Sequence, residues 1–385
     1  MSGSPQTPLV IDLTRLLSRI GKRFSGIDRV EFEYLRFLKE QGETYGLLRT
    51  RWGYLLVDQS GMQRLYPLIA PQWAGRSLAK WRVLAQLRFF AVTRARFSTL
   101  NKALLRLFPN GFCYLNVGHS ALSASFFATL RSAGCQEIRI MIHDVIPLSY
   151  PEYQRPETIV KFEKGFMAAL EFADQIIVTT RSEKAQVVAA TNKRNLRLPS
   201  LLQAPLGSDH FSPPNGGDGA ETSSSPFVIL GTIEPRKNHS LLLDIWSSPS
   251  RPNAELVIVG ARGWRNEEVF RRLDAGIDGV SERNGVSDAE LVQLLRHSRA
   301  LLFPSFAEGF GLPAVEAARM GVPIICSDIP VFRELLGDYA TYIDPHDRDG
   351  WAEAIRLAET QESVTRSHFS ATDWSSHFEL VFKVS

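Results

Sequence analysis

The sequence predicts an α/β protein made of two doubly wound domains that face each other across a cleft. The chain has 385 residues, more than the ~250–300 at which a single hydrophobic core stops growing. In both halves, apolar runs of strand length alternate with helical patterns, which is typical of βαβ units and parallel sheets. Between the halves, residues 212–226 are almost entirely small or polar and cannot contribute to a core.

The N-terminal half begins with a strand pattern and a helical pattern. The helical pattern at 26–42 has Val30, Tyr34 and Phe37 on one face. The expected strands of this half are 9–14, 44–49, 53–58, 112–117, 137–143 and 175–180. We expect the first domain to span 1–206, followed by a linker at 207–226.

The alternation restarts after the linker and predicts a second doubly wound domain at 227–364. Its expected strands are 227–231, 255–260, 300–304, 323–328 and 341–344, with a weaker one near 276–280. Its expected helices are 238–247, 266–273, 287–297, 313–320 and 329–336. The tail at 365–385 is amphipathic, with Trp374, Phe378 and Phe382 at every fourth position. Ligands of such sheets bind beyond the carboxyl ends of the strands, so the site is expected in the loops there.

Charge, cysteine positions and apolar runs give no indication of a special partner, a cysteine metal site, secretion or a membrane-spanning helix. The net charge is only +3, which by itself indicates no special partner. The three cysteines, Cys113, Cys135 and Cys326, lie in or beside apolar stretches without metal-ligand spacing, as expected of reduced thiols in a cytoplasmic protein. The N-terminus lacks the pattern of a signal peptide, and no apolar run approaches the ~20 residues of a membrane-spanning helix.

The strongest motif is FPSFAEGFGLPAVEA at 303–317. A buried-type strand leads into a loop with Glu308 and Gly311, and Pro313 suits the first turn of a helix. Glycines and a helix N-terminus let backbone N–H groups approach an anion. With Glu308 in the loop and Glu316 in the first helical turn, both carboxylates can accept hydrogen bonds from one ligand, which suits sugar hydroxyls. Solvated charges at a helix start are the plainer explanation of either glutamate alone.

The same segment also matches a dinucleotide-binding fingerprint. GFGLPA has the form G-x-G-x-x-A, and Asp328 follows 19 residues after Gly309 at the end of the next strand. In a dehydrogenase, however, the first glycine directly follows the strand. Here SFAE intervenes, and an unpaired Glu308 beside Gly309 would repel a pyrophosphate. A dehydrogenase that uses nicotinamide cofactors therefore stays as a minor alternative.

Two further motifs follow strands, and a third lies near the N-terminus. Arg236 and Lys237 follow a strand and are expected to open a helix, where two cations form an anion site. A solvated basic pair on a helix is the alternative interpretation. His143 stands at the end of a strand, where functional and structural roles are about equally expected. Ser25 and Gly26 begin a helix after a loop, which is a weak indication of an anion site.

Taken together, these motifs resemble retaining glycosyltransferase family four, which has the GT-B fold of two Rossmann-like domains. The family includes bacterial mannosyl-, glucosyl- and rhamnosyltransferases of surface polysaccharide assembly. EGFGLPAVE resembles its E-x₇-E signature, and GTIEPRKN, HDVIPL and 172–187 accompany it. SGIDRV resembles the glycine loop of polysaccharide mannosyl- and rhamnosyltransferases. The match covers nearly the whole chain and is strongest at 227–345.

The resemblance implies a role for each matching residue. Arg236 and Lys237 would bind the donor diphosphate and stabilise the leaving group, Glu316 would hold the ribose and Glu308 the transferred hexose. His143 would contact that sugar near its anomeric carbon. The remaining donor contacts would be Gly26 from the other domain and the backbone N–H groups of Phe310, Gly311 and Leu312. The C-terminal helix would pack back on the N-terminal domain. Relatives are richer in glycine where this chain has Ser25-Gly26, so the closeness of the phosphate approach is open.

The expected reaction is therefore hexosyl transfer with retention, a stereochemical outcome that only the resemblance implies. GDP-mannose is the first donor suggested by SGIDRV, before UDP-glucose and dTDP-rhamnose, and the acceptor would be a glycan or a lipid-linked glycan. Two cations could stabilise the leaving group without a metal or another cofactor. Asp347 to Asp349 mimic a metal-binding D-x-D, but lie near an expected helix start and are interpreted as a cap. A non-catalytic nucleotide-sugar-binding protein remains the third class.

A basic zone lies in the N-terminal half. No Asp or Glu occurs between Asp58 and Glu137, a stretch with ten Lys and Arg. Within it, 73–108 mixes cations with Trp, Phe and Leu, as in helices that bind anionic lipid. An ordinary helical pair with a solvated basic face explains the pattern equally well. Nucleic acid is not expected, because no recognition motif accompanies the charge. We expect a cytoplasmic protein, with the inner face of the plasma membrane as its candidate surface.

Overall fold

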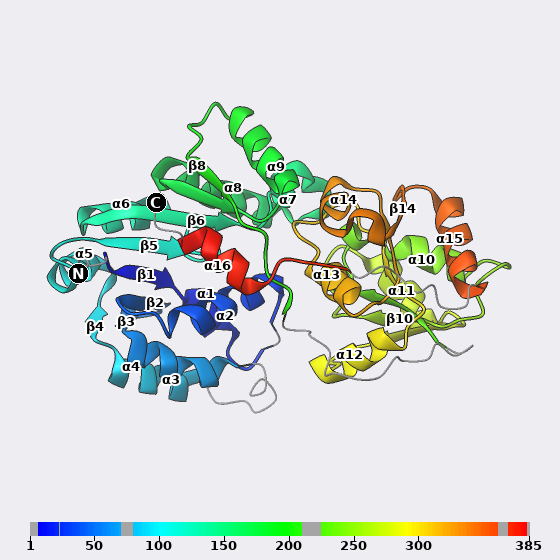
Figure 1. Cartoon of the computed structure of the whole chain (residues 1–385), viewed down its shortest axis with the longest axis horizontal. Helices are drawn as coiled ribbons and strands as arrows, with labels where there is room; N and C mark the ends of the chain where they lie inside the picture. The colour runs from blue at the N-terminus through cyan, green and yellow to red at the C-terminus, as the bar shows by residue number, and fades with distance from the viewer. Residues whose placement is uncertain (1–6, 23, 71–79, 210–224, 361–368, 383–385) are drawn as a thin grey trace. The chain divides into compact units, whose positions relative to one another are not determined.

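A computed structural model describes residues 7–22, 24–70, 80–209, 225–360 and 369–382 (Figure 1). The chain forms two compact units. The first contains Met1–His143, Val160–Val178 and Val187–Ala204, and the second contains Asp144–Ile159, Thr179–Gln186 and Pro205–Ser385. Two short segments that precede the expected linker are thus grouped with the second unit.

The first unit is built on an eight-stranded sheet in the order β4-β3-β2-β1-β5-β6-β7-β8. The strands from β2 through β1, β5, β6 and β7 to β8 are each paired in parallel with the next strand in this spatial order. The strands are β1 Leu9–Asp12, β2 Thr44–Thr50, β3 Gly53–Val57, β4 Thr93–Ala95, β5 Phe112–Asn116, β6 Cys135–Ile142, β7 Gln175–Val178 and β8 Ser200–Gln203. The carboxyl ends of β1, β5 and β6 therefore lie side by side.

One edge of this sheet departs from the predicted parallel arrangement. β2 and β3 form an antiparallel hairpin, and β4 pairs with β3 in the same antiparallel manner. Only Arg51 and Trp52 separate β2 from β3, whereas a parallel crossover needs a dozen residues or more. β4 and β8 are short strands that the sequence analysis does not include.

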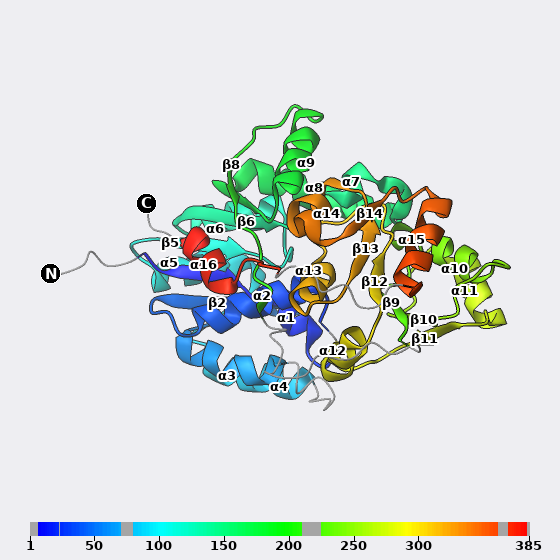
Figure 2. The same ribbon diagram turned by 45° about the vertical axis from the view of Figure 1, so that its right-hand side comes forward.

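Helices cover the sheet of the first unit, and some helical segments between its strands belong to the second unit, among them Ile146–Ser149 and Pro151–Tyr153. α1 follows β1 directly, and its Leu16 and Leu17 are buried. α3 packs on α2 and β2, and α4 packs on α3 and β3, as Figures 1 and 2 show. The helices between β1 and β8 are α1 Thr14–Arg19, α2 Gly26–Leu38, α3 Gln59–Ile69, α4 Lys80–Phe90, α5 Leu100–Leu107, α6 Ala124–Ser132, α7 Ile146–Ser149, α8 Pro156–Phe172 and α9 Arg181–Asn192, with 3₁₀ turns at Phe97–Thr99 and Pro151–Tyr153.

The second unit is built on a six-stranded sheet in the order β11-β10-β9-β12-β13-β14. All five neighbouring pairs are parallel, and the order is the doubly wound one in which the chain reverses direction beside the first strand. The strands are β9 Phe227–Leu230, β10 Leu256–Val259, β11 Val280–Arg283, β12 Ala300–Phe303, β13 Ile324–Ser327 and β14 Thr341–Ile343. The switch point therefore lies where β9 and β12 end.

Five helices of the second unit agree closely with the expected ranges, whereas the helix at Arg348–Thr360 was expected only as a helix start near Asp347. The helices of this unit are α10 His239–Trp246, α11 Glu267–Ala275, α12 Asp288–Arg296, α13 Leu312–Arg319, α14 Pro330–Leu336, α15 Arg348–Thr360 and α16 Trp374–Phe382, with 3₁₀ turns η5 at Pro235–Lys237 and η6 at Gly337–Tyr339. The four residues each of β9, β10, β12 and β13 are all buried, as expected of strands covered by helices on both faces. Trp246 and Trp351 are among the largest side chains of this core.

The structure describes little of the expected linker, and it shows how the C-terminal helix is anchored. Residues 210–224, most of the expected linker, lie outside the described residues. In the tail, α16 is anchored within its own unit: the Trp374 N–H donates to Asp209 at 3.0 Å, and a ring nitrogen of His377 lies 2.9 Å from the Pro205 carbonyl oxygen. The packing of this helix on the N-terminal domain stays a prediction.

Candidate functional site

The basic pair of the second unit lies between β9 and α10. Pro235 begins the 3₁₀ turn η5, which contains Arg236 and Lys237, and Asn238 then takes a left-handed conformation with φ of +54°. α10 begins only at His239. The expectation that the two cations open a helix is therefore wrong: Asn238 in its left-handed conformation separates the turn from the helix.

Arg236 and Lys237 form a buried network with two carboxylates. The Lys237 Nζ lies 2.6 Å from Glu308 Oε1, and one terminal nitrogen of Arg236 lies 2.9 Å from the same oxygen. The other terminal nitrogen of Arg236 donates to Glu234 Oε1 at 2.6 Å. All four side chains are at most 14% exposed. The charges of the two cations and the two carboxylates cancel within this network.

Burial and pairing act in opposite directions on the pKa values of this network. Burial raises the pKa of Glu308, but Arg236 and Lys237 overcome it and hold the pKa at about 2. Burial lowers the pKa of Lys237, although Glu308 opposes the shift. Glu308 is therefore an anion at neutral pH, and it owes this state to the basic pair.

The glycine loop of the second unit connects β12 to α13. Gly311 has φ of +80°, and a Cβ there would lie 2.7 Å from the ring of Phe332. α13 begins at Leu312. Pro313 has no N–H, and the Ala314 N–H donates to the Gly311 carbonyl oxygen at 2.9 Å. The backbone N–H groups at this helix start are therefore those of Gly311 and Leu312. Glu316 is the fifth residue of the helix and is buried, which places it in the second turn rather than the expected first. The side chains of Phe310 and Leu312 are also buried.

The geometry around Asp328 argues against the dinucleotide alternative. β12 ends at Phe303 and α13 begins at Leu312, which leaves a loop far longer than the tight turn of a dinucleotide fingerprint. The two carboxylate oxygens of Asp328 accept hydrogen bonds from Arg333, at 2.7 and 2.8 Å. The acidic residue that would bind a ribose is thus already engaged by a neighbouring side chain.

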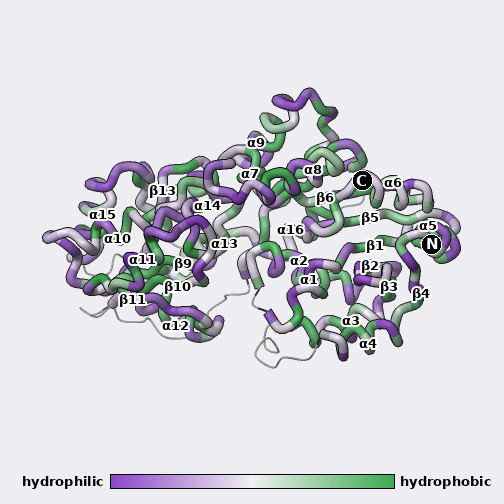
Figure 3. The backbone as a smooth tube through the Cα atoms, turned by 180° about the vertical axis from the view of Figure 1, so that it is seen from behind, coloured by the Kyte–Doolittle hydropathy of each residue, from purple (hydrophilic) through white to green (hydrophobic). Residues whose placement is uncertain are grey.

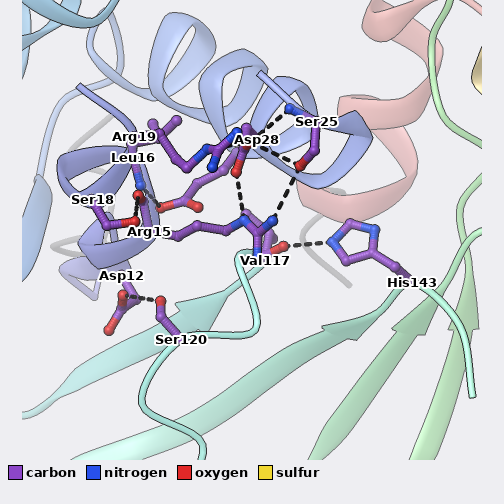
Figure 4. Close-up of polar contacts among 11 residues, drawn as sticks. Asp12, Arg15, Leu16, Ser18, Arg19, Ser25, Asp28, Val117, Ser120 and His143 are labelled. Atoms are coloured by element: carbon purple, nitrogen blue, oxygen red, sulfur yellow. Dashed lines mark hydrogen bonds and ion pairs between the residues drawn. The ribbon is translucent and has the colours of Figure 1, made fainter. Parts of the chain in front are cut away.

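The Ser25-Gly26 segment of the first unit is held by a buried aspartate. Asp28, which is fully buried, accepts hydrogen bonds from the Ser25 N–H at 2.6 Å and the Ser25 hydroxyl at 2.8 Å. The Nε atoms of Arg15 and Arg19 lie 2.6 and 2.8 Å from its two oxygens. Figure 4 shows these contacts where α1 and α2 approach each other. Gly26 is the first residue of α2 and follows this fixed cap directly.

His143 directly follows β6 and is 7% exposed. Its Nε2 lies 2.6 Å from the Val117 carbonyl oxygen, a contact drawn in Figure 4. A carbonyl oxygen only accepts hydrogen bonds, so Nε2 carries the proton. In the neutral ring, Nδ1 is then the nitrogen that accepts a hydrogen bond.

Several residues at these sites are absent from the sequence predictions. Asp28 could have been found, because Ser25 and Asp28 have the spacing of a helix capping box. Nothing in the sequence marks Glu234 as the partner of Arg236, or Asp12 as a buried carboxylate at the end of β1 that accepts hydrogen bonds from Ser120 and Tyr114. Burial raises the pKa of Asp12.

The described residues contain no cluster of three or more His, Cys, Asp or Glu side chains that could hold a metal ion. Asp347 of the D-x-D sequence accepts a hydrogen bond from the Gly350 N–H at 2.9 Å. It thus caps α15, as the sequence predicted.

Comparison with known proteins identifies the second unit. Residues 219–372 match the family Glycosyl transferases group 1. The serotype-specific mannosyltransferase WbdA of Escherichia coli is 30% identical over 279 residues, which cover 66% of this chain and 34% of WbdA. O-antigen chain mannosyltransferase B of Escherichia coli is 29% identical over 218 residues, 54% of this chain and 57% of that protein. The chain thus spans about a third to three fifths of the length of these relatives.

Solved structures support the fold over nearly the whole chain. Sucrose-phosphate synthase from Thermosynechococcus elongatus has a TM-score of 0.61 and 16% identity, with 98% of this chain and 94% of that chain covered. The lipopolysaccharide outer core galactosyltransferase WaaB has a TM-score of 0.54 and 15% identity, with 97% and 98% covered. The predicted fold class is confirmed: the chain has the two α/β sheets of GT-B glycosyltransferases, and its second sheet lies within the residues that match Glycosyl transferases group 1.

Proposed function

We propose that the chain is a retaining glycosyltransferase that moves a hexose, with mannose as the first candidate, from a nucleoside-diphosphate sugar to a glycan or lipid-linked acceptor of surface polysaccharide. The mannosyltransferase names of several relatives support the sugar and the pathway class. The network of Arg236, Lys237 and Glu308 is the observation that carries the proposal, since it places two buried cations beside a carboxylate at the switch point of the sheet.

The chemistry follows from what leaves during the transfer. Departure of a nucleoside diphosphate builds negative charge, and buried, preorganised cations stabilise such charge far better than water does. Arg236 and Lys237 supply these cations, and the backbone N–H groups of Phe310, Gly311 and Leu312 add fixed dipoles. Gly26 is the proposed diphosphate contact of the first unit.

Carboxylate and imidazole groups complete the proposed donor site. Glu308 accepts hydrogen bonds from the hexose and Glu316 from the ribose. His143 accepts one from the transferred sugar through Nδ1, the nitrogen left unprotonated by the Nε2 contact with Val117. No side chain is assigned as a nucleophile, so retention is proposed to proceed by same-face displacement, without a metal.

Removal of one member of the network tests the activity. In Lys237→Ala and Glu308→Gln, we expect the rate of hexose transfer from GDP-mannose to fall by about 10²–10³-fold, as for loss of one group that stabilises developing charge. Transfer is measured as release of GDP and, by anomeric NMR of the product, as retention. Lys193→Ala, at an exposed cation directly after α9, is the control. Wild-type rates in both network variants, with unchanged melting temperatures, would sink the assignment.

A thermal-shift screen separates the donor from the two alternative functions. GDP-mannose is expected to raise the melting temperature more than UDP-glucose, dTDP-rhamnose or NADH at equal concentration. Stabilisation by NADH alone would favour the dehydrogenase. Stabilisation by a nucleotide sugar without any transfer or hydrolysis would identify a binding protein.

Association with an anionic membrane surface is the remaining part of the proposal. On α4, Trp81 and Phe89 are 65% and 79% exposed, and Arg82 and Arg88 are exposed beside them. The hydropathy colours in Figure 3 accordingly change from residue to residue along this helix. Trp52 of the β2–β3 turn, 52% exposed, lies 5.8 Å from the Arg88 guanidinium. Residues 71–79 of the basic zone lie outside the described residues. Among the residues that the structure describes, no helix is both long and apolar enough to cross a bilayer.

Liposome co-sedimentation tests this surface. Binding to vesicles of phosphatidylglycerol and phosphatidylcholine is expected to exceed binding to phosphatidylcholine alone and to weaken with salt. Trp81→Ser/Phe89→Ser and Arg82→Glu/Arg88→Glu should each weaken it. Lys193→Glu/Arg197→Glu changes two exposed cations elsewhere on the same unit and is the matched control. Equal binding by all variants, or indifference to lipid charge and salt, would remove the membrane from the proposal.

A further inference from the structure

His119 lies in the loop between β5 and α6, in an uncommon backbone conformation. Its φ is +54°, in the left-handed region that non-glycine residues rarely adopt. Such conformations persist where the surrounding contacts hold them. Its ring contacts Phe162 of α8 on one side, and its hydrogen bonds lead to the end of β6, where His143 stands.

The ring of His119 binds the backbone at the end of β6. Its Nε2 accepts a hydrogen bond from the His143 N–H at 3.4 Å. The ring also forms a hydrogen bond with the backbone of Met141. Because Nε2 is the acceptor, the donor to Met141 is Nδ1, which fixes the tautomer of His119. One imidazole thus contacts the backbone of Met141 near the end of β6 and of His143 directly after the strand.

The rings of His119 and His143 are also in contact. Their centroids lie 5.1 Å apart at an angle of 57°. His143 is held on its other side, because its Nε2 donates to the Val117 carbonyl oxygen, two residues before His119. The β5–α6 loop therefore fixes both the backbone and the imidazole of His143.

The environment keeps His119 uncharged. Burial lowers its pKa, and the neighbouring His143 and Arg15 lower it further, to about 3. At neutral pH the Nε2 lone pair is consequently available to the His143 N–H.

We propose that His119 is a positioning residue, which orients His143 so that its Nδ1 meets the transferred sugar. The inference rests on the proposed function in one respect, the contact between His143 and the sugar. It adds a residue that touches neither substrate nor leaving group, and whose effect passes through His143 alone.

His119→Asn is the variant that tests this role. Asparagine tolerates the left-handed conformation and can donate to Met141. It lacks the ring, and its acceptor, Oδ1, lies on a shorter side chain that does not extend to the place of Nε2 beside the His143 N–H. We expect kcat for hexose transfer to fall by up to about 100-fold, as when a reacting group is misplaced. KM for the nucleotide sugar and the melting temperature should stay close to wild type. His297→Asn, at an exposed histidine in the second unit, is the control.

Two further measurements separate this proposal from the proposed function. In ¹⁵N NMR, the His143 ring of the wild type should show the Nε2–H tautomer, and its signals should shift in His119→Asn. The double variant His119→Asn/His143→Ala should be no slower than His143→Ala alone. Unchanged His143 signals, wild-type kcat in His119→Asn, or a further loss of rate in the double variant would each overturn the positioning role. Wild-type transfer by His143→Ala would instead contradict the proposed role of His143 in the reaction.

Discussion

At the scale of single residues, Gly311 shows how closely the glycine loop is packed. Two constraints act there at once: φ is +80°, and a Cβ would lie 2.7 Å from the Phe332 ring. Gly321, at the end of α13, has nearly the same φ of +78°, but no atom within 4 Å of a Cβ. The two glycines therefore separate backbone strain from steric overlap.

We expect Gly311→Ala to lower the free energy of unfolding more than Gly321→Ala does. Both variants carry the left-handed penalty of roughly 1–2 kcal/mol, and overpacking against Phe332 should add about 1–3 kcal/mol at position 311 alone. Urea denaturation of the two variants and the wild type measures the difference. Equal losses would mean that the Phe332 ring moves aside freely.

The sequence identifies the residues of the second unit's site, but not their pairing. Glu308 and Lys237 are 71 residues apart, and no local rule connects positions so distant. The argument that an unpaired Glu308 would repel a pyrophosphate does not apply, because Glu308 is paired: the parallel order places the end of β9 beside the end of β12. Glu234 was missed because its importance depends on the direction in which the Arg236 guanidinium points.

At the scale of elements, α2 depends on Asp28 for its N-terminal anchoring. This one carboxylate holds Ser25 and also balances Arg15 and Arg19 from the preceding helix. Asp347 has a simpler role, because it caps α15 through the Gly350 N–H at the surface. Asparagine caps helices about as well as aspartate does, so an Asp to Asn change separates the two roles.

Asp28→Asn is expected to lower the free energy of unfolding by roughly 3 kcal/mol, since it removes one partner of a buried ion pair. Asp347→Asn should change it by only a few tenths of a kcal/mol, because the cap survives. Chemical denaturation of both variants provides the comparison. If the two changes cost the same, the ion pairs of Asp28 contribute nothing beyond a cap.

Elements with a single strong pattern were predictable, and those at the edges of the sheets were less so. α10, α12 and α14 lie within a residue or so of their expected ranges, because their apolar periodicity is strong and turn or capping residues, such as Ser287 before α12 and Pro330 and Gly337 at the ends of α14, stand nearby. β11 was expected near 276–280 but begins at Val280, because Gly276 and Gly279, both with φ of +77°, form the preceding turn. The β2–β3 hairpin shows that the length of a connection has to be weighed along with alternation.

At the scale of the whole molecule, buried histidines make stability depend on pH. His239 is 1% exposed, and neither of its ring nitrogens has a hydrogen-bond partner among the described residues. Burial and the nearby Lys237 lower its pKa to about 3. Its pKa in the unfolded chain is about 6.5. Between these values the unfolded state binds a proton that the folded state rejects, so stability is complete above pH 6.5 and falls as the pH falls.

His239→Leu should therefore reduce the loss of stability on acidification. Between pH 7.5 and 5.0, the wild type should lose up to about 1.4 kcal/mol per pH unit below 6.5 from this histidine, and the variant should lose that much less. Each urea midpoint is compared with the same protein's midpoint at pH 7.5, which removes the packing effect of leucine. His297→Leu is the control. Burial raises the pKa of Glu31, which makes stability fall as the pH rises. The wild type and both histidine variants share this contribution, so it cancels in the comparison.

The contact between Glu308 and the basic pair has a consequence for ligand entry. Without a donor, Arg236 and Lys237 already hold a built-in counterion on a loop. A diphosphate that binds there replaces Glu308 as the partner of Arg236 and Lys237. The Glu308 carboxylate can then accept hydrogen bonds from the sugar hydroxyls. Such an exchange leaves the number of free ions nearly unchanged, so donor affinity should vary less with ionic strength than it would at two bare cations.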